Sequence, residues 1–154
     1  MRRLFIIRKD LHLSPGKLAA MVSHCAEAYW TRLIRNNIED IPGPEGNMYR
    51  LNSIFLDTDI VEKYICGIFT KTICEAKNKN QLMKVIDLIN EHNNQVSDDQ
   101  KLVEDVDYGF INDCCLTELT PENEDGTTTI GIWFKPLSDD IAHKFSKKFK
   151  LYRD

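Results

Sequence analysis

The 154-residue sequence has no apolar run long enough to cross a bilayer, and residues 1–3 lead into a short apolar stretch rather than a secretory signal. Its five cysteines are an odd number, and most of them stand within apolar stretches. A chain of this length can bury a core without disulfides. These absences predict a single domain over residues 1–154, with no membrane partner, in the reducing cytoplasm.

An excess of positive charge is also missing, since the formal net charge is −4 at pH 7 and the pI is about 5.6. Nucleic-acid binding usually relies on a basic face. The cations gather near the two chain ends, at Arg2, Arg3, Arg8, Lys9 and Lys17 and again at Lys144, Lys147, Lys148, Lys150 and Arg153. If both ends fold to one side, a local basic patch can persist within an acidic total. The alternative is an ordinary solvated surface.

Several motifs that carry well-known chemistry are absent. The sequence has no P-loop, no glycine fingerprint of a dinucleotide-binding fold and no serine-centred nucleophile elbow. Cys114-Cys115 and His24-Cys25 do not have the spacing of a structural zinc site. No base is suitably spaced to activate a cysteine nucleophile. We therefore expect neither a metal nor another cofactor.

The apolar spacing predicts an α/β fold. Strand-like runs cover residues 4–7, 68–75, 106–111 and 127–134, and helical spacing covers residues 15–35, 80–92 and a final helix that begins at Ser138-Asp139-Asp140. The resulting order is strand, helix, strand, helix, strand, strand, helix. That order indicates a mixed sheet with helices packed on its faces.

Two connections are harder to interpret. Residues 42–46, Pro-Gly-Pro-Glu-Gly, are expected to break any regular structure. The residues from there to Lys63 are ambiguous, with a short helix ending near Gly67 as one interpretation. Residues 93–104 are polar and are expected to form a loop.

Lys17 stands in the first turn of the first predicted helix, after the N-cap Ser14 and Pro15. A helix N-terminus favours anions, so a lysine there indicates a negatively charged ligand. Met21 and His24 follow at i+4 and i+7, on the same stripe of the helix. Taken singly, the lysine also fits a solvated side chain and the histidine a structural role.

Asp113 follows the apolar strand over residues 106–111, and Thr117 and the threonines at 127–129 come soon after. A carboxylate among hydroxyl groups can orient a water molecule and accept its proton, and an ammonium group can stabilise the oxyanion that forms at a carbonyl. This combination suffices for ester hydrolysis. The alternative is that Asp113 makes a turn and the threonines suit strand surfaces.

The sequence resembles the type-2 peptidyl-tRNA hydrolases, the archaeal and eukaryotic type. In "FIIRKDLHLSPGKLAAMVSHCA" the matching residues are Arg8, Asp10, Gly16, Lys17, Ala19, Ala20 and His24. The family's second signature resembles "DCCLTEL" at Asp113, Thr117 and Glu118, and its Gly-Thr-x-Thr resembles residues 126–129. The terminal "FKLY" also resembles the family's usual chain end.

This resemblance implies an α/β domain with a mixed four-stranded β-sheet, and hydrolysis of the ester that joins a peptide to the 3′ end of tRNA, which recycles peptidyl-tRNA. The catalytic residues that it implies are Lys17, Asp113, Thr117 and Thr129. The residues that would bind substrate are His24, Gly16, Met21 and Arg8. Peptidyl-tRNA is the expected partner, and a homodimer is left open.

The chain departs from the family pattern at several positions. Met21 replaces a glutamine, Cys114-Cys115-Leu116 replaces Ala-Gly and a basic residue, and residues 122–125 add negative charge. Residues 37–63 form a long, divergent connection. Each departure is expected to weaken RNA affinity or alter a loop. The alternative function is therefore a catalytically impaired homologue that binds RNA or protein. Cys114 and Cys115 are predicted to be reduced and at least partly buried.

Overall fold

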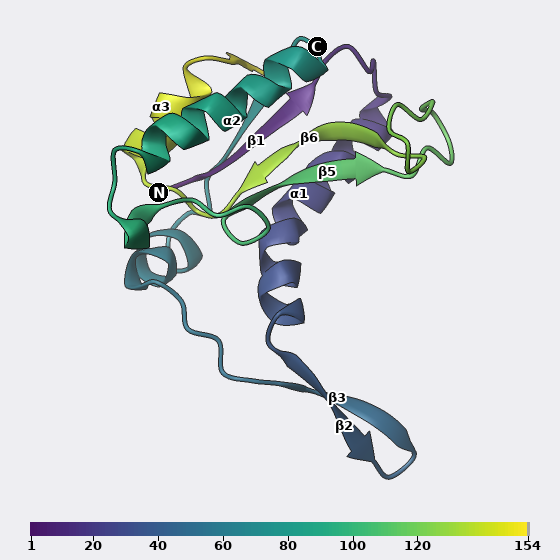
Figure 1. Cartoon of the computed structure of the whole chain (residues 1–154), viewed down its shortest axis with the longest axis vertical. Coiled ribbons are helices and arrows are strands. Elements are labelled where there is room, and N and C mark those ends of the chain that lie inside the picture. Colours follow the sequence, from purple (N-terminus) through teal and green to yellow (C-terminus); the bar gives the residue numbers. More distant parts are fainter. Residues whose placement is uncertain (154) are drawn as a thin grey trace.

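The computed structural model describes residues 1–153 and shows a mixed sheet with the strand order β5-β6-β1-β4-β7 (Figure 1). The strands are β1 (Arg3–Arg8), β4 (Lys71–Ala76), β5 (Tyr108–Asp113), β6 (Thr128–Phe134) and β7 (Lys150–Leu151). The predicted α/β fold is confirmed. The sheet has five strands rather than four, because the two-residue β7 pairs antiparallel with β4 at one edge.

Strand β1 occupies the centre of the sheet. Its apolar run, residues 4–7, is fully buried, as expected for a strand that is covered on both faces. It pairs parallel with β4 and antiparallel with β6. The two strands beside β1 carry the outer strands, because β7 pairs with β4 and β5 pairs with β6.

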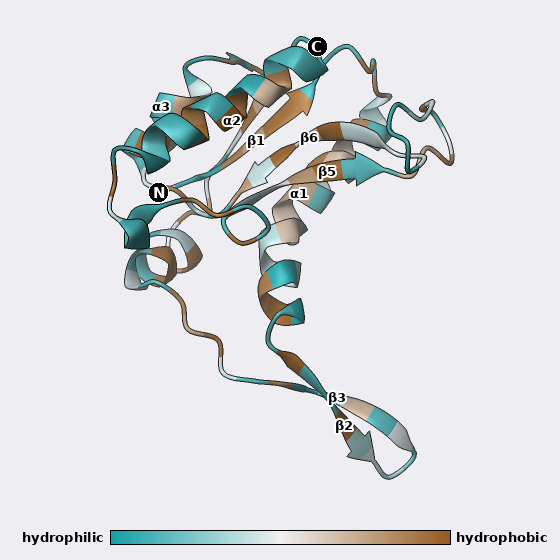
Figure 2. Cartoon of the chain, in the orientation of Figure 1, coloured by the Kyte–Doolittle hydropathy of each residue, from teal (hydrophilic) through white to brown (hydrophobic). Residues whose placement is uncertain are grey.

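Helices cover both faces of this sheet. The helix α1 (Pro15–Arg35) packs on one face, and α2 (Lys79–Asn93) and α3 (Asp139–Ser146) pack on the other (Figure 1). Two apolar clusters fill the layers between helices and sheet, and Figure 2 shows the apolar residues concentrated there. Each helix begins after a side-chain cap, at Ser14, Asn78 and Ser138 respectively.

The predicted helix over residues 15–35 has the bounds of α1, and the other two helices begin within a residue of their predicted starts. Two strands differ more. β4 begins three residues later than predicted, and Ile68 is left 86% exposed. β5 begins at Tyr108, after Asp105 with φ 62°, and it extends to Asp113. Asp113 is thus the last residue of a strand and not part of the loop after it.

Residues 37–63 contain structure that the sequence did not reveal. The strands β2 (Ile38–Gly43) and β3 (Gly46–Leu51) form an antiparallel hairpin that projects away from the sheet (Figure 1). The prediction that residues 42–46 break regular structure is wrong, because Pro44-Glu45 forms the turn and Gly46 takes φ +132°, which suits glycine. The expected short helix exists as a single-turn π-helix, η1 (Ile60–Ile65), and residues 93–104 include a 3₁₀ turn, η2 (Asp98–Gln100).

All five cysteines are free thiols. Cys115 is half-buried, but Cys114 is exposed, so the prediction of partial burial is wrong for Cys114. The reason is that β5 ends at Asp113 and Cys114 lies on the loop beyond the sheet. None of the helices formed by residues 1–153 is long and apolar enough to span a membrane.

Candidate active site

Lys17 and Asp113 form an ion pair between the first turn of α1 and the last residue of β5. Both groups are largely shielded, since the side chain of Lys17 is 15% exposed and that of Asp113 is 8% exposed. Weak solvent screening strengthens the attraction between such charges. The structure thus brings together two residues that are far apart in the sequence and that we predicted to be catalytic.

The surroundings of Asp113 favour its charged form. Its Oδ1 accepts a hydrogen bond of 2.8 Å from the backbone N–H of Cys115, whose φ of 56° turns the loop back toward the carboxylate. Burial alone would raise the pKa of Asp113, but the hydrogen bonds from Lys17 and Cys115 and the charge of Lys17 outweigh burial and lower it. Asp113 is therefore an ionised carboxylate, as a proton acceptor must be.

The ion pair borders an open cavity of about 650 Å³ between α1 and strands β5 and β6. Its α1 wall includes Lys17, Met21, His24, Ala28, Thr31, Arg32 and Arg35, at the helical spacing that the sequence indicated. Thr117 also lines the cavity, and within residues 1–153 its hydroxyl has no hydrogen-bond partner. The arrangement leaves a carboxylate, an ammonium group and a hydroxyl beside one space.

The remaining predicted substrate-binding residues differ in their access to this cavity. His24 is exposed in the wall, whereas Met21 is only 4% exposed and packs in the apolar layer under α1. Gly16 does not line the cavity, and a Cβ added there would meet nothing within 4 Å. No protein atom lies close enough to position 16 to require glycine there.

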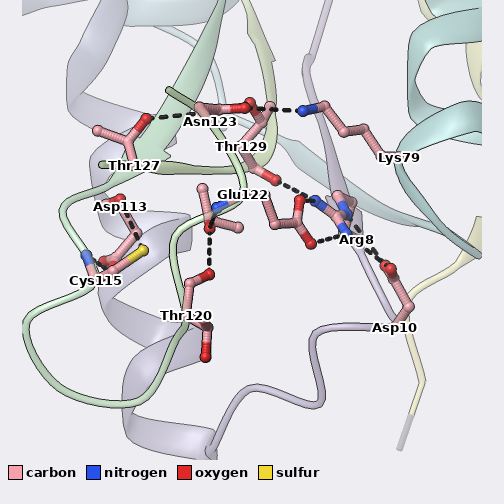
Figure 3. A network of polar contacts seen from close by, with 11 residues as sticks. Arg8, Asp10, Lys79, Asp113, Cys115, Thr120, Glu122, Asn123, Thr127 and Thr129 are labelled. Atoms are coloured by element: carbon pink, nitrogen blue, oxygen red, sulfur yellow. Dashed lines mark hydrogen bonds and ion pairs between the residues drawn. The ribbon is translucent and has the colours of Figure 1, made fainter. Parts of the chain in front are cut away.

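Thr129 lies outside this cavity. β5 and β6 pair Ile111 with Gly131 and Asn112 with Thr129, which leaves Ile130 as the extra residue of a β-bulge. The Thr129 hydroxyl accepts a 3.3 Å hydrogen bond from the side chain of Asn123. Asn123 in turn accepts a hydrogen bond from Lys79 at the start of α2, on the sheet face opposite α1 (Figure 3).

Arg8 also lies outside the cavity and is committed to other partners. It is 3% exposed, and its guanidinium donates to Asp10, to both carboxylate oxygens of Glu122 at 2.6 and 3.0 Å, and to the carbonyl of Thr129 (Figure 3). The hydrogen bond with Arg8 lowers the pKa of Glu122. The acid at position 122, which the sequence marks as added negative charge, is neutralised by a buried arginine.

The loop over residues 114–127 is held at a second point near the ion pair. The Ser14 hydroxyl donates a 2.5 Å hydrogen bond to Glu118, and the same Ser14 oxygen accepts from the backbone N–H of Lys17. The hydrogen bond from Ser14 lowers the pKa of Glu118. The loop that carries Thr117 is thus tied to the residue that caps α1.

Sequence reasoning gave no role to Asn123 or Trp133. The Asn123 contact arises from the bulge at Ile130, and no local sequence pattern marks that bulge. Glu118 had a signal, because it occupies the last position of the second signature. The sequence pattern predicted only that Trp133 belongs to a strand, although Trp133 lines the cavity.

Of the ten cations that the sequence places near the two chain ends, only Lys17 lines the cavity. Arg2 pairs with Asp139, Arg3 is buried, and Lys9 lies 3.8 Å from Glu75. Across residues 1–153, no three His, Cys, Asp or Glu side chains gather into a group that could hold a metal ion. The chemistry beside the cavity therefore has to be argued from the ion pair and its neighbours.

The fold and this cavity define a small α/β protein with a charged, open site at the end of a sheet strand. Residues 1–152 match the model of one protein family, "Peptidyl-tRNA hydrolase PTH2", and the chain belongs to that family. The resemblance seen in the sequence is therefore confirmed. Membership supports hydrolysis of peptidyl-tRNA as the general activity. Comparison with curated proteins found no match.

Proposed function

We propose that this protein hydrolyses the ester bond between a peptide, or an N-blocked amino acid, and the 3′ end of tRNA. The observation that carries the proposal is the Lys17–Asp113 ion pair at the border of an open cavity. In water-dependent ester cleavage a shielded carboxylate can accept the proton of the water, and an ammonium group can stabilise the oxyanion. Family membership supports the same substrate class.

In the proposed reaction, the Asp113 carboxylate accepts a proton from a water molecule as that water attacks the ester carbonyl carbon. Lys17 has three N–H donors, so it can stay near Asp113 and also face the oxyanion that develops. Collapse of the tetrahedral intermediate breaks the bond to the ribose oxygen, which receives the proton from Asp113. The products are free tRNA and a peptide carboxylic acid, which releases its proton to the solvent and becomes a carboxylate.

The neighbouring residues have supporting roles in this proposal. Thr117 orients the water or the ester through its unpartnered hydroxyl, and His24 contacts the substrate from the exposed wall. Thr129 and Arg8 act indirectly, by holding the loop over residues 114–127 through Asn123 and Glu122. Met21 supports the wall from below, and Gly16 contributes only backbone beside Lys17.

One observation favours the alternative, a catalytically impaired homologue that binds RNA or protein. The buried Met21 supplies no amide group to the wall, and Cys114 and Leu116 leave the loop without a basic side chain. The retained ion pair argues for the enzyme. In either case we propose that the chain acts as a single domain in the cytoplasm, where its substrate forms.

The direct test is release of the acyl group from N-acetyl-aminoacyl-tRNA by the purified protein under single-turnover conditions. We expect release at micromolar protein, with deacylated tRNA as the second product. If the protein binds tRNA but releases no acyl group, the proposed hydrolase function is wrong and the alternative function as a binding module is supported.

The pH dependence tests the role of Asp113 separately. The pKa of Asp113 is lowered, so kcat/KM should hold its plateau as the pH falls into the ordinary range of carboxyl groups and should decline only below that range. Lys17→Met removes the hydrogen bond and charge that lower this pKa while burial still raises it, so the acidic limb should move to higher pH. The same carboxylate stabilises the fold above its unfolded-state pKa, and that stability is lost as the pH falls through the folded-state pKa.

The measurement is the kcat/KM profile from about pH 3, below the ordinary carboxyl pKa, to about pH 8, with Lys9→Met as the control that removes a lysine outside the cavity. Identical acidic limbs in wild type and Lys17→Met would contradict this role of the ion pair.

A further inference from the structure

The cavity continues along α1 well beyond the Lys17–Asp113 pair. Arg35 lies eighteen positions after Lys17, and both residues line the cavity. At the rise of a helix they stand about 27 Å apart along the axis. We call the part bordered by Thr31, Arg32, Arg35 and Trp133 the distal end. A substrate whose ester lies at the ion pair would extend one of its two halves toward this end.

The distal end contains an unsatisfied hydrogen-bond donor. Trp133 is fully buried, and its Nε1 is the one buried side-chain nitrogen or oxygen in residues 1–153 that has no hydrogen-bond partner. Its indole lies against Gly109 of the neighbouring strand, where a Cβ would come within 3.0 Å of Nε1. Buried donors are nearly always paired, so an unpaired one in a side chain that lines the cavity is unusual, and here the N–H is enclosed by the protein.

The charges of the distal end are mostly positive. The Arg32 guanidinium lies 6.0 Å from the Trp133 ring centroid and is 2.8 Å from Asp105. Arg35 is exposed, and it has no hydrogen bond or ion pair within the described chain. Glu27 is the one acid of the cavity wall besides Asp113, which Lys17 neutralises. A site with free cationic charge on a chain of net charge −4 favours an anionic ligand.

We propose that the distal end binds the sugar-phosphate backbone of the single-stranded 3′ end of tRNA, with Arg35 contacting a phosphate and the Trp133 side chain forming part of the wall. This inference rests on the proposed function for the direction in which the substrate lies. Of the two halves of the substrate, only the RNA carries negative charge at every residue, whereas peptides vary in charge. The peptide half of the bound substrate then extends from the ion pair toward the loop over residues 114–127.

An RNA that cannot be hydrolysed tests this inference apart from catalysis. The probe is a fluorescein-labelled oligoribonucleotide ending in CCA with a free 3′ hydroxyl, titrated by anisotropy at several salt concentrations. The variants are Arg35→Ala and, as the matched control, Lys148→Ala, which removes an exposed cation outside the cavity.

Arg35→Ala should weaken binding about fivefold to tenfold and should reduce the slope of log K against log salt by about 0.7 to 1, the value of one lost phosphate contact. Lys148→Ala should leave both near the wild-type values. Equal behaviour of the two variants would overturn the inference.

A second readout uses the indole itself. In a Trp30→Phe background Trp133 is the one remaining tryptophan, so binding of an unlabelled CCA-ending oligoribonucleotide should shift or quench its emission. Unchanged emission at saturating RNA would place the RNA elsewhere and overturn the inference.

The outcomes also separate the inference from the proposed function. If Arg35→Ala weakens RNA binding and the wild type releases no acyl group, the RNA site at the distal end is supported and the proposed hydrolytic function is wrong. If acyl release is normal but Arg35→Ala changes KM only according to peptide length, the distal end binds the peptide and the inference falls.

Discussion

Replacing Asp113 with asparagine is expected to lower kcat for N-acetyl-aminoacyl-tRNA by about 10²- to 10⁴-fold, the usual range for loss of a proton acceptor. Asparagine keeps the shape of the side chain and can still accept the hydrogen bond of 2.8 Å from Cys115. It cannot take a proton from water. Because Asp113 is not proposed to hold the substrate, KM should change much less than kcat.

Asp140→Asn is the matched control, since Asp140 is exposed in the first turn of α3, outside the cavity. Lys17→Met should lower kcat by about 10²- to 10³-fold, the effect of removing one oxyanion donor. It also leaves the Asp113 carboxylate without its cation, so thermal unfolding should be measured in parallel. If the Asp113→Asn variant keeps the wild-type kcat, the proposed mechanism is wrong.

Arg3→Ala is expected to reduce the free energy of unfolding by about 3 kcal/mol, the largest effect on stability that we predict outside the active site. The Arg3 side chain is fully buried, and burial lowers its pKa to about 10. Its guanidinium donates to the carbonyls of Phe134 at 3.0 Å and Cys25 at 2.9 Å, and also to that of Ala26. It therefore joins β6 to the middle of α1, and alanine would leave both a cavity and lost hydrogen bonds.

Two further variants separate these contributions. Arg3→Met retains most of the volume without the charge or the donors, so it should cost less than alanine if packing dominates. Arg2→Ala removes a half-exposed partner of Asp139 and should cost less than about 1 kcal/mol. Urea unfolding at pH 7 measures all three. A loss below 1 kcal/mol for Arg3→Ala would show that this buried contact does not stabilise the fold.

The helices could be predicted from the sequence because each carries a local signal at its start. Ser14 with Pro15, and Ser138 with two acids, mark α1 and α3 within one turn. The hairpin of β2 and β3 has no such signal, since none of its residues is buried and no apolar alternation marks its faces. β7 is too short for any pattern and exists because the chain end returns beside β4.

For the candidate site, the sequence could place Lys17 and Asp113 together because each has a local signal. Lys17 lies at the start of a predicted helix, and Asp113 lies at the end of a predicted strand. The sequence placed Arg8 in the same group by resemblance, and Thr129 both by resemblance and by its position among the threonines that follow Asp113. Their side chains are instead committed to Glu122 and Asn123, on a loop whose path depends on distant contacts. Sequence position indicates where a backbone lies, but the bulge at Ile130 determines which way the preceding residues of β6 face.

The hairpin of β2 and β3 offers a practical handle on the molecule. Its turn at Pro44-Glu45 stands far from the helices and the five-stranded sheet (Figure 1). Its two strands pair only with each other, and the pairing ends at Leu51, before the chain reaches η1. A fluorophore, an affinity tag or a surface tether attached at this turn would report on or immobilise the protein without entering the packed layers. No residue of the hairpin lines the cavity, so shortening the hairpin to a brief linker would remove none of the cavity's lining residues.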